Sequence, residues 1–256
     1  MENIIKNKTD FELDGVTLKK SLINQDEVQQ VLDDINRFVN EKKNQLEEGR
    51  EINYADKDKG IVNSLHMLEN YDGYFFHELA KRKSIVSIAE NLLNCEVKLL
   101  SVQSFVKPKG KGLPAPFHQD NAYWCIEPAD GLTIWIALDS CNKENGMVKY
   151  IKGSHKIGVV KHTPSLAPGS SQIILENDLP KGEVFCPDLS QGDAAIHHTM
   201  NIHGSNPNTS GNQRRGLLFC YCSKKALRNK DLFERYQKNL SKLILMRKDK
   251  RELFYP

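Results

Sequence analysis

The sequence has no run of about 18 consecutive apolar residues, so it predicts no transmembrane helix. Its six cysteines include no Cys-x-x-Cys pair, which argues against the common zinc sites and leaves reduced, buried thiols as the expectation. The first residues lack the apolar segment and cleavage site of a secretory signal, so we expect a cytoplasmic protein. No charge of one sign dominates, since 36 Lys and Arg stand against 33 Asp and Glu. Composition alone therefore points to neither a membrane nor a nucleic-acid partner.

What the chain does have is enough length for one large domain. With 256 residues, 39% of them hydrophobic, it can bury a core without a disulfide or metal staple. We expect one domain over residues 1–256, made of a helical N-terminal layer (about 1–95), a β core (about 96–223) and a basic helical segment (about 224–256). The last segment, counted from Ser223, holds eleven Lys or Arg and four Asp or Glu, so the rest of the chain is net acidic.

The hydrophobic pattern changes near residue 95. Before it, apolar residues recur at three- and four-residue steps and predict helices over residues 25–38, 74–80 and 84–93, with a solvated loop over residues 41–59. After it, short runs of β-forming residues between Gly, Pro and Asn turns predict an all-β sandwich or jelly roll. The strand candidates are residues 97–106, 132–138, 147–151, 182–186, 193–197 and 216–222. An apolar helical stripe over residues 232–244 would cover the sheet or meet a second subunit, so the oligomeric state stays open.

One short segment carries a metal-ligating pattern. His118 and Asp120 are two residues apart, and on an extended segment their side chains would face one point. His203, which precedes the last strong strand, is the candidate for a third ligand. Two histidines and one carboxylate bind one face of an octahedral ion and leave three positions open, which suits non-heme Fe(II). The His-x-Asp pattern alone is weak, and a polar loop pair is the alternative.

Arg214 follows His203 by eleven residues, at the start of the strand candidate 216–222. A guanidinium beside the metal would pair with a carboxylate through two hydrogen bonds, as a 2-oxoacid chelating iron requires. The alternative is that Arg214 and Arg215 are surface charges at the entry to a strand. Only one of the two can point inward, because neighbours on a strand face opposite sides.

Two stretches together resemble a known family: FHQDNAYW through GLTIWIALDSCNKENGMVKYIKGSHKIG, and QGDAAIHHTMNIHGSNPNTSGNQRRGLLFCYC. They resemble the phytanoyl-CoA dioxygenase family of Fe(II)/2-oxoglutarate-dependent oxygenases, whose fold is a double-stranded β-helix, a form of jelly roll with helices packed on the sheet. The resemblance covers about residues 97–223. It implies that His118, Asp120 and His203 are the iron ligands. The cosubstrate positions that it implies are Arg214 and Ser205 on the far carboxylate of 2-oxoglutarate, Trp124 beside it, and Thr133 and Gln103 as further polar candidates.

The resemblance also implies a reaction. Fe(II), 2-oxoglutarate and O2 would serve to hydroxylate an unactivated C–H bond of a small molecule, with release of succinate and CO2. Related halogenases replace the carboxylate ligand with a small residue, and Asp120 is retained here, which favours hydroxylation or another oxidation. Lys107, Asn121 and Tyr123 are candidates for substrate contact, although Asn121 and Tyr123 would otherwise only order their loop. The basic loop 107–112 and the basic tail suggest an anionic or zwitterionic substrate, unless these lysines are simply solvated.

Other readings stay open at this point. A nucleic-acid or protein demethylase or hydroxylase of the same superfamily would use the basic C-terminal segment, but that segment lacks interleaved aromatic residues, so we expect no nucleic-acid partner. Another alternative is a non-catalytic binding module that keeps the fold. The intact ligand pattern argues against it. His198 is expected to line the strand near the metal or to support its ligands, with His197 pointing the other way, and Trp135 is expected in the core.

Overall fold

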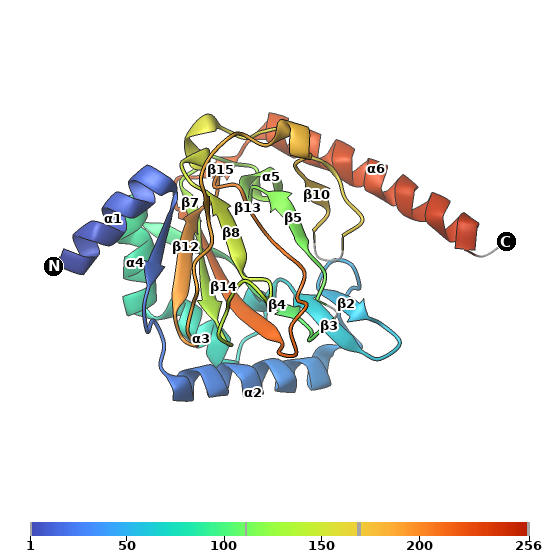
Figure 1. Cartoon of the computed structure of the whole chain (residues 1–256), viewed down its shortest axis with the longest axis horizontal. Helices are drawn as coiled ribbons and strands as arrows, with labels where there is room; N and C mark the ends of the chain where they lie inside the picture. Colours follow the sequence, from blue (N-terminus) through green and yellow to red (C-terminus); the bar gives the residue numbers. More distant parts are fainter. Residues whose placement is uncertain (1, 111, 168–169, 255–256) are drawn as a thin grey trace.

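Two antiparallel sheets face each other and form the predicted jelly roll (Figure 1). The computed structural model describes residues 2–110, 112–167 and 170–254, with side chains between residues 7 and 246 of these ranges. In spatial order the larger sheet is β1 (Val16–Lys19), β12 (Ala194–His198), β7 (Gly131–Ala137), β14 (Arg214–Ser223), β4 (Val97–Lys107), β3 (Ile61–Leu65) and β2 (Ile52–Asp56). The smaller sheet is β11 (Val184–Phe185), β8 (Val148–Ile151), β13 (His203–Ser205) and β5 (Ala115–His118). The strand pairs β10–β9 (Gln172–Ile173, Thr163–Pro164) and β15–β6 (Leu227–Arg228, Ile126–Glu127) complete the β structure.

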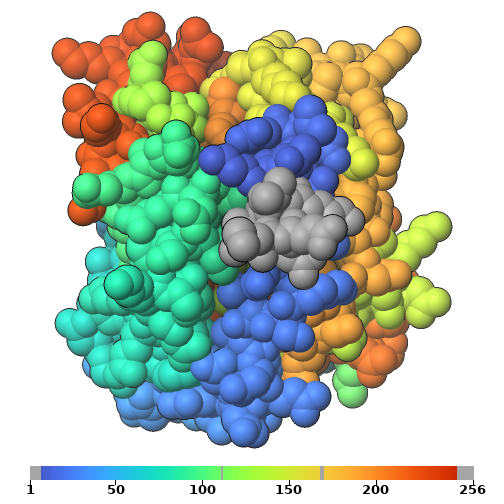
Figure 2. All heavy atoms as spheres, turned by 90° about the vertical axis from the view of Figure 1, so that its left-hand side faces the viewer, coloured from blue at the N-terminus to red at the C-terminus, as the bar shows by residue number. Residues whose placement is uncertain are grey.

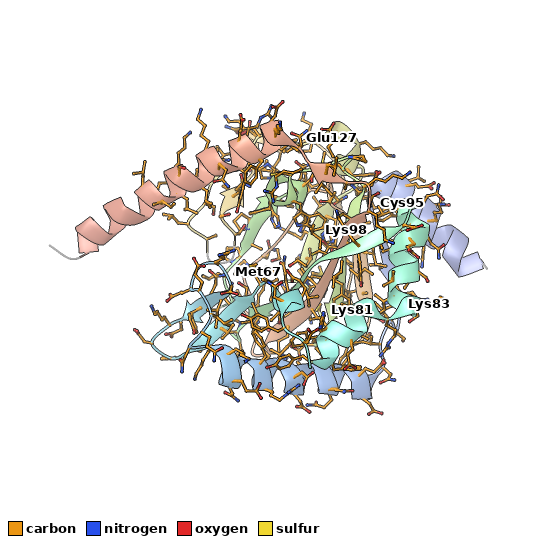
Figure 3. The ribbon with its side chains drawn as sticks, turned by 180° about the vertical axis from the view of Figure 1, so that it is seen from behind. Met67, Lys81, Lys83, Cys95, Lys98 and Glu127 are labelled. Carbon is orange, nitrogen blue, oxygen red and sulfur yellow. The ribbon has the colours of Figure 1, made fainter. Side chains whose placement is uncertain are left out.

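The helices cover the outer face of the larger sheet and the end of the roll. They are α1 (Glu2–Asp14), α2 (Gln25–Lys42), α3 (Phe75–Lys81), α4 (Lys83–Leu93), α5 (Asn121–Trp124) and α6 (Lys230–Phe254), with the short 3-10 turns η1 (Leu68–Asn70), η2 (Ser154–Ile157) and η3 (Glu176–Asp178). Figure 2 shows the blue N-terminal segment lying against the teal α3–α4 region. Seen from behind, Lys81 and Lys83 mark the α3–α4 junction on the side away from α6 (Figure 3). The sheet is thereby shielded from solvent on its outer face.

Helix α2 shows how the local sequence starts an element. The Glu27 amide donates to Asn24 Oδ1 at 2.9 Å, and the Asn24 amide donates to Glu27 Oε2 at 2.9 Å, which satisfies two amides at the start of the helix. Such a cap contributes about 1 kcal/mol. The buried side chains on one face of the helix, Val28, Val31, Leu32 and Phe38, then pack into the core.

Strand β7 contributes its two faces to two separate hydrophobic clusters, which lie on opposite sides of the larger sheet. Its side chains alternate: Ile134 and Ile136 join the core beneath the helices, whereas Trp135 and Ala137 lie in a second cluster between the two sheets. All seven residues of β7 are buried, which explains why this strand reads as a continuous apolar run. The inner compartment, between the sheets, is where Thr133 and Trp135 lie.

The N-terminal layer is not purely helical. Residues 41–59 were expected to form a solvated loop, but the structure has β2 there, paired with β3 through the turn at Lys57–Gly60. The alternation in Ile52-Asn-Tyr is short and its edge strand is only half-buried, so it gives little signal. Strand β1 likewise extends the larger sheet by pairing with β12. Residues before 95 therefore supply three of the seven strands of this sheet.

Helix α6 leaves the body of the molecule and runs outward (Figure 1). Its first half docks beside α5 and β9. Leu243 is buried, whereas Ile244, Leu245 and Met246 are exposed. Among the residues that the structure describes, every helix is too short or too polar to span a bilayer.

Candidate metal centre

A row of four side chains crosses the inner face of the larger sheet. Ser101 pairs with Cys220, Cys220 with Thr133, and Thr133 with His197, on four neighbouring strands. Residues directly opposite each other in antiparallel strands project from the same face, so all four point into the roll. The row brings a hydroxyl, a thiol, a second hydroxyl and an imidazole to one level. Asp120 reaches this level from outside the sheet.

Asp120 lies at the turn that starts α5, with helical backbone angles and no side-chain cap of its helix. The expectation that His118 and Asp120 share an extended segment is therefore wrong, since only His118 is on a strand. The turn frees the carboxylate to point inward. Thr133 Oγ1 donates to its Oδ2 at 2.7 Å, and His197 Nε2 lies 3.2 Å from the same oxygen. The other oxygen, Oδ1, is left to face the histidines.

His118 and His203 are cross-strand partners on β5 and β13 of the smaller sheet. Nδ1 of His118 lies 2.8 Å from the Pro116 carbonyl, and Nδ1 of His203 lies 3.0 Å from the Asn201 carbonyl. A carbonyl only accepts, so both rings carry their proton on Nδ1 and present the lone pair of Nε2. These Nε2 atoms lie 3.8 Å and 3.6 Å from Asp120 Oδ1.

The three side chains together can hold a metal ion. One ligand atom from each lies within 4.8 Å of the others, and each ring orientation is fixed by a backbone carbonyl. The exposed side-chain fractions of His118, Asp120 and His203 are 16%, 16% and 10%, against 1% for His197. The cluster therefore opens to solvent on the side away from His197.

Burial and mutual charge set the protonation that a metal needs. Burial, with the neighbouring His203, lowers the pKa of His118 to about 4. Burial, with His197, lowers the pKa of His203 to about 4 as well. Burial alone would raise the pKa of Asp120, but the surrounding histidines outweigh it and lower that pKa. At neutral pH the cluster thus offers two neutral imidazoles and one carboxylate, the form that binds a cation.

Arg214 and Arg215 take opposite faces of β14, as the alternation predicts. Arg215 turns away from the interior and pairs with Asp139, through Nε to Oδ2 at 2.8 Å and Nη2 to Oδ1 at 2.7 Å. Arg214 is 3% exposed and lies on the inner face with its guanidinium 5.1 Å from the Trp135 ring centroid. Its Nη2 donates to the Gly146 carbonyl at 3.0 Å, and its buried Nε has no partner among the described residues.

Two glycines make room around Arg214. A Cβ on Gly216 would lie 2.3 Å from Trp135 Cζ2, so the indole packs directly on the strand backbone. Gly146, at φ +77°, would place a Cβ 2.5 Å from the Asn206 carbonyl oxygen. Trp135 is buried in the second hydrophobic cluster, as expected of a core residue, and its ring is also the aromatic neighbour of Arg214. The sequence signal for this inner position is that Trp135 lies two residues after Thr133 on one strand, so both side chains project from the same face.

Lys107 is not part of a solvated loop. It ends β4 directly opposite Arg214, is 5% exposed, and its Nζ bonds to the Leu113 carbonyl. Burial, with the nearby Arg214, lowers the pKa of Lys107 to about 7. Two basic side chains thus share one end of the inner compartment, and Arg214 keeps its charge more readily than Lys107. Lys111 of the same loop lies outside the described residues.

The remaining predicted cosubstrate residues lie at different levels. Ser205 is buried on β13. Gln103 is on the inner face opposite Leu218, and its Nε2 donates to Ser101 Oγ at 3.4 Å. Trp124 packs with Ile126, Cys222 and Ala226. Cys222 is at the opposite end of β14 from Arg214, and Thr133 pairs with Cys220 between them. Trp124 therefore lies at the end of the sheet away from the arginine.

The two predicted substrate residues of α5 differ. Both polar groups of the Asn121 side chain bond to the Ile126 backbone, at 3.1 Å and 3.0 Å, so this residue orders the turn. The Tyr123 ring stands edge-on to His118, with 5.8 Å between ring centroids. Its hydroxyl accepts from the Gln172 amide at 3.1 Å, and burial raises the pKa of Tyr123 to about 12. Tyr123 therefore lies beside the open side of the cluster as a neutral phenol.

Sequence reasoning missed two residues and misplaced one. His197 contacts Asp120, whereas His198 lies on the outer face of β12 near Phe11, so the expected roles of the two are reversed. The four residues between β12 and β13 break the alternation that would connect them to His203. Gln119 was also missed. Its buried side chain donates to the Gly158 and Met200 carbonyls at 2.8 Å and 2.7 Å, which fixes the backbone between the two candidate ligands.

Comparisons of the sequence with known proteins find a family and several relatives. A sequence model of the phytanoyl-CoA dioxygenase family matches residues 11–216. A probable alpha-ketoglutarate-dependent hypophosphite dioxygenase of Stutzerimonas stutzeri is 27% identical over 217 residues, covering 82% of this chain and 75% of that protein. An L-proline trans-4-hydroxylase of Streptomyces griseoviridis is 29% identical over 180 residues, covering 62% of this chain and 67% of that protein.

Solved structures share the fold. The epimerase SnoN, solved with Fe3+, alpha ketoglutarate and nogalamycin RO, superposes with a TM-score of 0.69 at 18% identity, covering 89% of this chain and 86% of that chain. At this identity the likeness concerns the arrangement of sheets and helices alone. Helix α6 lies after the last residue matched by the family model.

Proposed function

This chain belongs to the phytanoyl-CoA dioxygenase family, and from that membership we propose which residues carry its chemistry and on what class of substrate. It is a 2-oxoglutarate-dependent non-heme iron oxygenase that uses Fe(II), 2-oxoglutarate and O2. We assign iron binding to His118, Asp120 and His203. We assign the far carboxylate of 2-oxoglutarate to Arg214, with Ser205 beside it. The observation that carries this assignment is the convergence of two Nε2 atoms and Oδ1 at one point.

The donor set fits ferrous iron. Two imidazole nitrogens and one carboxylate oxygen on one side of an ion leave three positions for a chelating cosubstrate and O2. The fixed Nδ1 protons mean that His118 and His203 need no rearrangement to bind. Bound iron and 2-oxoglutarate would supply the oxidising chemistry, while this chain's residues orient the reactants and exclude water.

The inner compartment also fits a dicarboxylate. Buried polar atoms without a partner in the described residues include Arg214 Nε and the Tyr150 hydroxyl. Leaving such donors unpaired is costly, and a bound carboxylate would satisfy them. Lys107 adds a second basic group at the same end, and a bound carboxylate would favour its charged form. Arg214 therefore acts as the anchor that turns the reactive end of the cosubstrate toward Asp120.

For the substrate we infer a small anionic or zwitterionic molecule that is hydroxylated at an unactivated C–H bond. The names of two relatives support the class, since one is named a probable hypophosphite dioxygenase and another an L-proline trans-4-hydroxylase. Retention of Asp120 supports hydroxylation. The basic loop gives less support than the sequence suggested, because Lys107 faces the arginine rather than the surface. Tyr123, beside His118 on the open side, is the residue placed to contact substrate.

The site assignment is tested with matched arginine variants. Wild type with Fe(II) and 2-oxoglutarate under anaerobic conditions should show a weak visible charge-transfer band, and in air it should form succinate. Arg214→Met should lose both, because the carboxylate anchor is removed. Arg215→Met, on the opposite face of the same strand, should keep both. If the Arg215 variant loses the band and the Arg214 variant keeps it, the cosubstrate assignment is wrong.

The substrate class is tested by a screen. Purified enzyme is incubated with phosphorus oxyanions, amino acids, carboxylates and neutral analogues, and succinate formation above the substrate-free rate is measured. A product with a mass increase of one oxygen atom identifies hydroxylation. Stimulation confined to neutral compounds would contradict the anionic or zwitterionic class.

A further inference from the structure

His197 has no part in the proposed ligand set, yet it is the most deeply buried histidine of the cluster. Its side chain is 1% exposed, between Val16 of β1 and Thr133 of β7. Its ring centroid lies 4.2 Å from that of His203 across the space between the sheets. A polar ring in this position needs a reason, because burying it without hydrogen bonds is unfavourable.

The contacts of His197 fix where its proton resides. Nε2 lies 3.2 Å from Asp120 Oδ2, and a carboxylate oxygen only accepts. Nδ1 is buried and has no partner among the described residues. The tautomer with hydrogen on Nε2 therefore makes the one available bond, and it turns His197 into a donor toward the carboxylate. This orientation is opposite to that of His118 and His203, whose protons are on Nδ1.

Two donors consequently converge on one carboxylate oxygen. Thr133 Oγ1 donates to Asp120 Oδ2 at 2.7 Å, and His197 Nε2 approaches it from the neighbouring strand. Oδ2 is thereby engaged on the sheet side, whereas Oδ1 lies 3.6 Å and 3.8 Å from the Nε2 atoms of the two candidate ligands. The carboxylate cannot turn to present both oxygens to a metal without breaking these hydrogen bonds.

We propose that His197 is a positioning residue which, with Thr133, holds Asp120 as a one-oxygen ligand. A carboxylate that bound through both oxygens would occupy a fourth position on an octahedral ion, leaving two where 2-oxoglutarate and O2 together need three. His197 thus preserves the position for O2 without touching the metal. This inference rests on the proposed function, because it presumes that Asp120 binds iron.

Three variants separate positioning from packing. His197→Phe keeps a ring of similar size and removes the donor. His197→Gln keeps an N–H group that can reach Oδ2. His198→Phe is the matched control, because this adjacent histidine faces the other side of β12, with its ring 5.9 Å from Phe11 and 5.5 Å from His155.

The first measurement is the affinity of metal-free protein for Co(II). Loss of a residue that supports a metal ligand typically weakens metal binding about 10- to 100-fold, and we expect a loss of that size for His197→Phe. His197→Gln should recover most of it, and His198→Phe should bind as wild type does even if its melting temperature falls. A purely structural role for His197 would lower the melting temperature of both His197 variants without separating their affinities.

The second measurement titrates 2-oxoglutarate against protein saturated with Fe(II), followed by the visible band in the absence of air. In His197→Phe the freed Oδ2 competes for the position of the cosubstrate, so half-saturation should require more 2-oxoglutarate than in wild type or His197→Gln. Unchanged Co(II) affinity in His197→Phe, or equal losses in the Phe and Gln variants, would overturn the positioning role alone. A wild type that binds neither metal nor cosubstrate would instead overturn the proposed function, and this inference with it.

Discussion

Replacing Gly216 by alanine probes the packing that holds the arginine anchor. The added Cβ would meet three atoms of the Trp135 indole, Cζ2 at 2.3 Å, Cε2 at 2.5 Å and Nε1 at 2.9 Å. An indole is rigid and this one is 4% exposed, so it can move only by displacing its neighbours. Overpacking of this kind costs about 1–3 kcal/mol. For a chain of this size, each kcal/mol lowers the melting temperature by roughly 2–4 °C.

The expected result for Gly216→Ala is a melting temperature lower by about 2–12 °C, and weaker binding of 2-oxoglutarate. The second effect follows because the Arg214 guanidinium lies over the same indole, 5.1 Å from its centroid. Thermal unfolding of the metal-free protein measures the first effect, and titration of the visible band measures the second. Gly211→Ala is the control, since a Cβ there meets nothing within 4 Å and the stability should change by less than about 0.5 kcal/mol.

A double variant shows whether the indole is the cause. Trp135→Phe removes the fused ring that the new Cβ would strike, so the cost of Gly216→Ala should shrink by at least about 1 kcal/mol in that background. Two results would refute this explanation. One is a Gly216→Ala variant as stable as Gly211→Ala, and the other is an equal loss of stability on Gly216→Ala with Trp or Phe at position 135.

Three further predictions concern the site. His118→Ala removes one of three ligands, so metal analysis after dialysis against Fe(II) should find well under one iron per chain. His162→Ala is the control and should retain more iron, because Nε2 of His162 bonds only to the backbone amide of Gln119. Arg214→Lys keeps the charge but loses the planar fork, and the dissociation constant of 2-oxoglutarate should rise roughly 10- to 100-fold, against no change for Arg215→Lys. The pKa values of His118 and His203 are about 4 in the folded protein, below the usual 6.5, so the unfolded chain binds more protons between these values. Urea unfolding of the metal-free protein should therefore show stability falling as pH drops from about 6.5 to about 4, and a flat profile would contradict the burial of these rings.

The strands that carry the site were predictable because they are strongly patterned. β7 and β14 are apolar runs between turn residues, and both are buried on their inner and outer faces. The alternation rule sufficed to state that one of Arg214 and Arg215 faces inward. It did not state which, because that depends on the register with β4 and β7, and the register is a property of the folded sheet.

The role of His197 was beyond sequence reasoning for a similar reason. Its contact with Asp120 requires that β12 pair with β7 in one register and that Asp120 leave the strand at a turn. No short sequence motif indicates either this register or this turn. His198 was expected near the metal instead, although strand alternation does not carry across the irregular connection between β12 and β13. Strand β2 was missed because it is half-buried at the edge of the sheet, so its sequence shows little alternation between apolar and polar residues.

The docking of α6 gives the C-terminal segment a direct connection to the ligands. Asn239 Nδ2 donates to the His162 carbonyl at 3.0 Å and to Gln172 Oε1 at 2.8 Å. His162 Nε2 in turn accepts the amide of Gln119, the residue between His118 and Asp120, at 3.0 Å. A helix beyond the residues matched by the family model is therefore connected through one residue, His162, to the backbone between two candidate metal ligands. A change in this segment would therefore alter the hydrogen bonds behind Gln119 as well as the surface of the molecule.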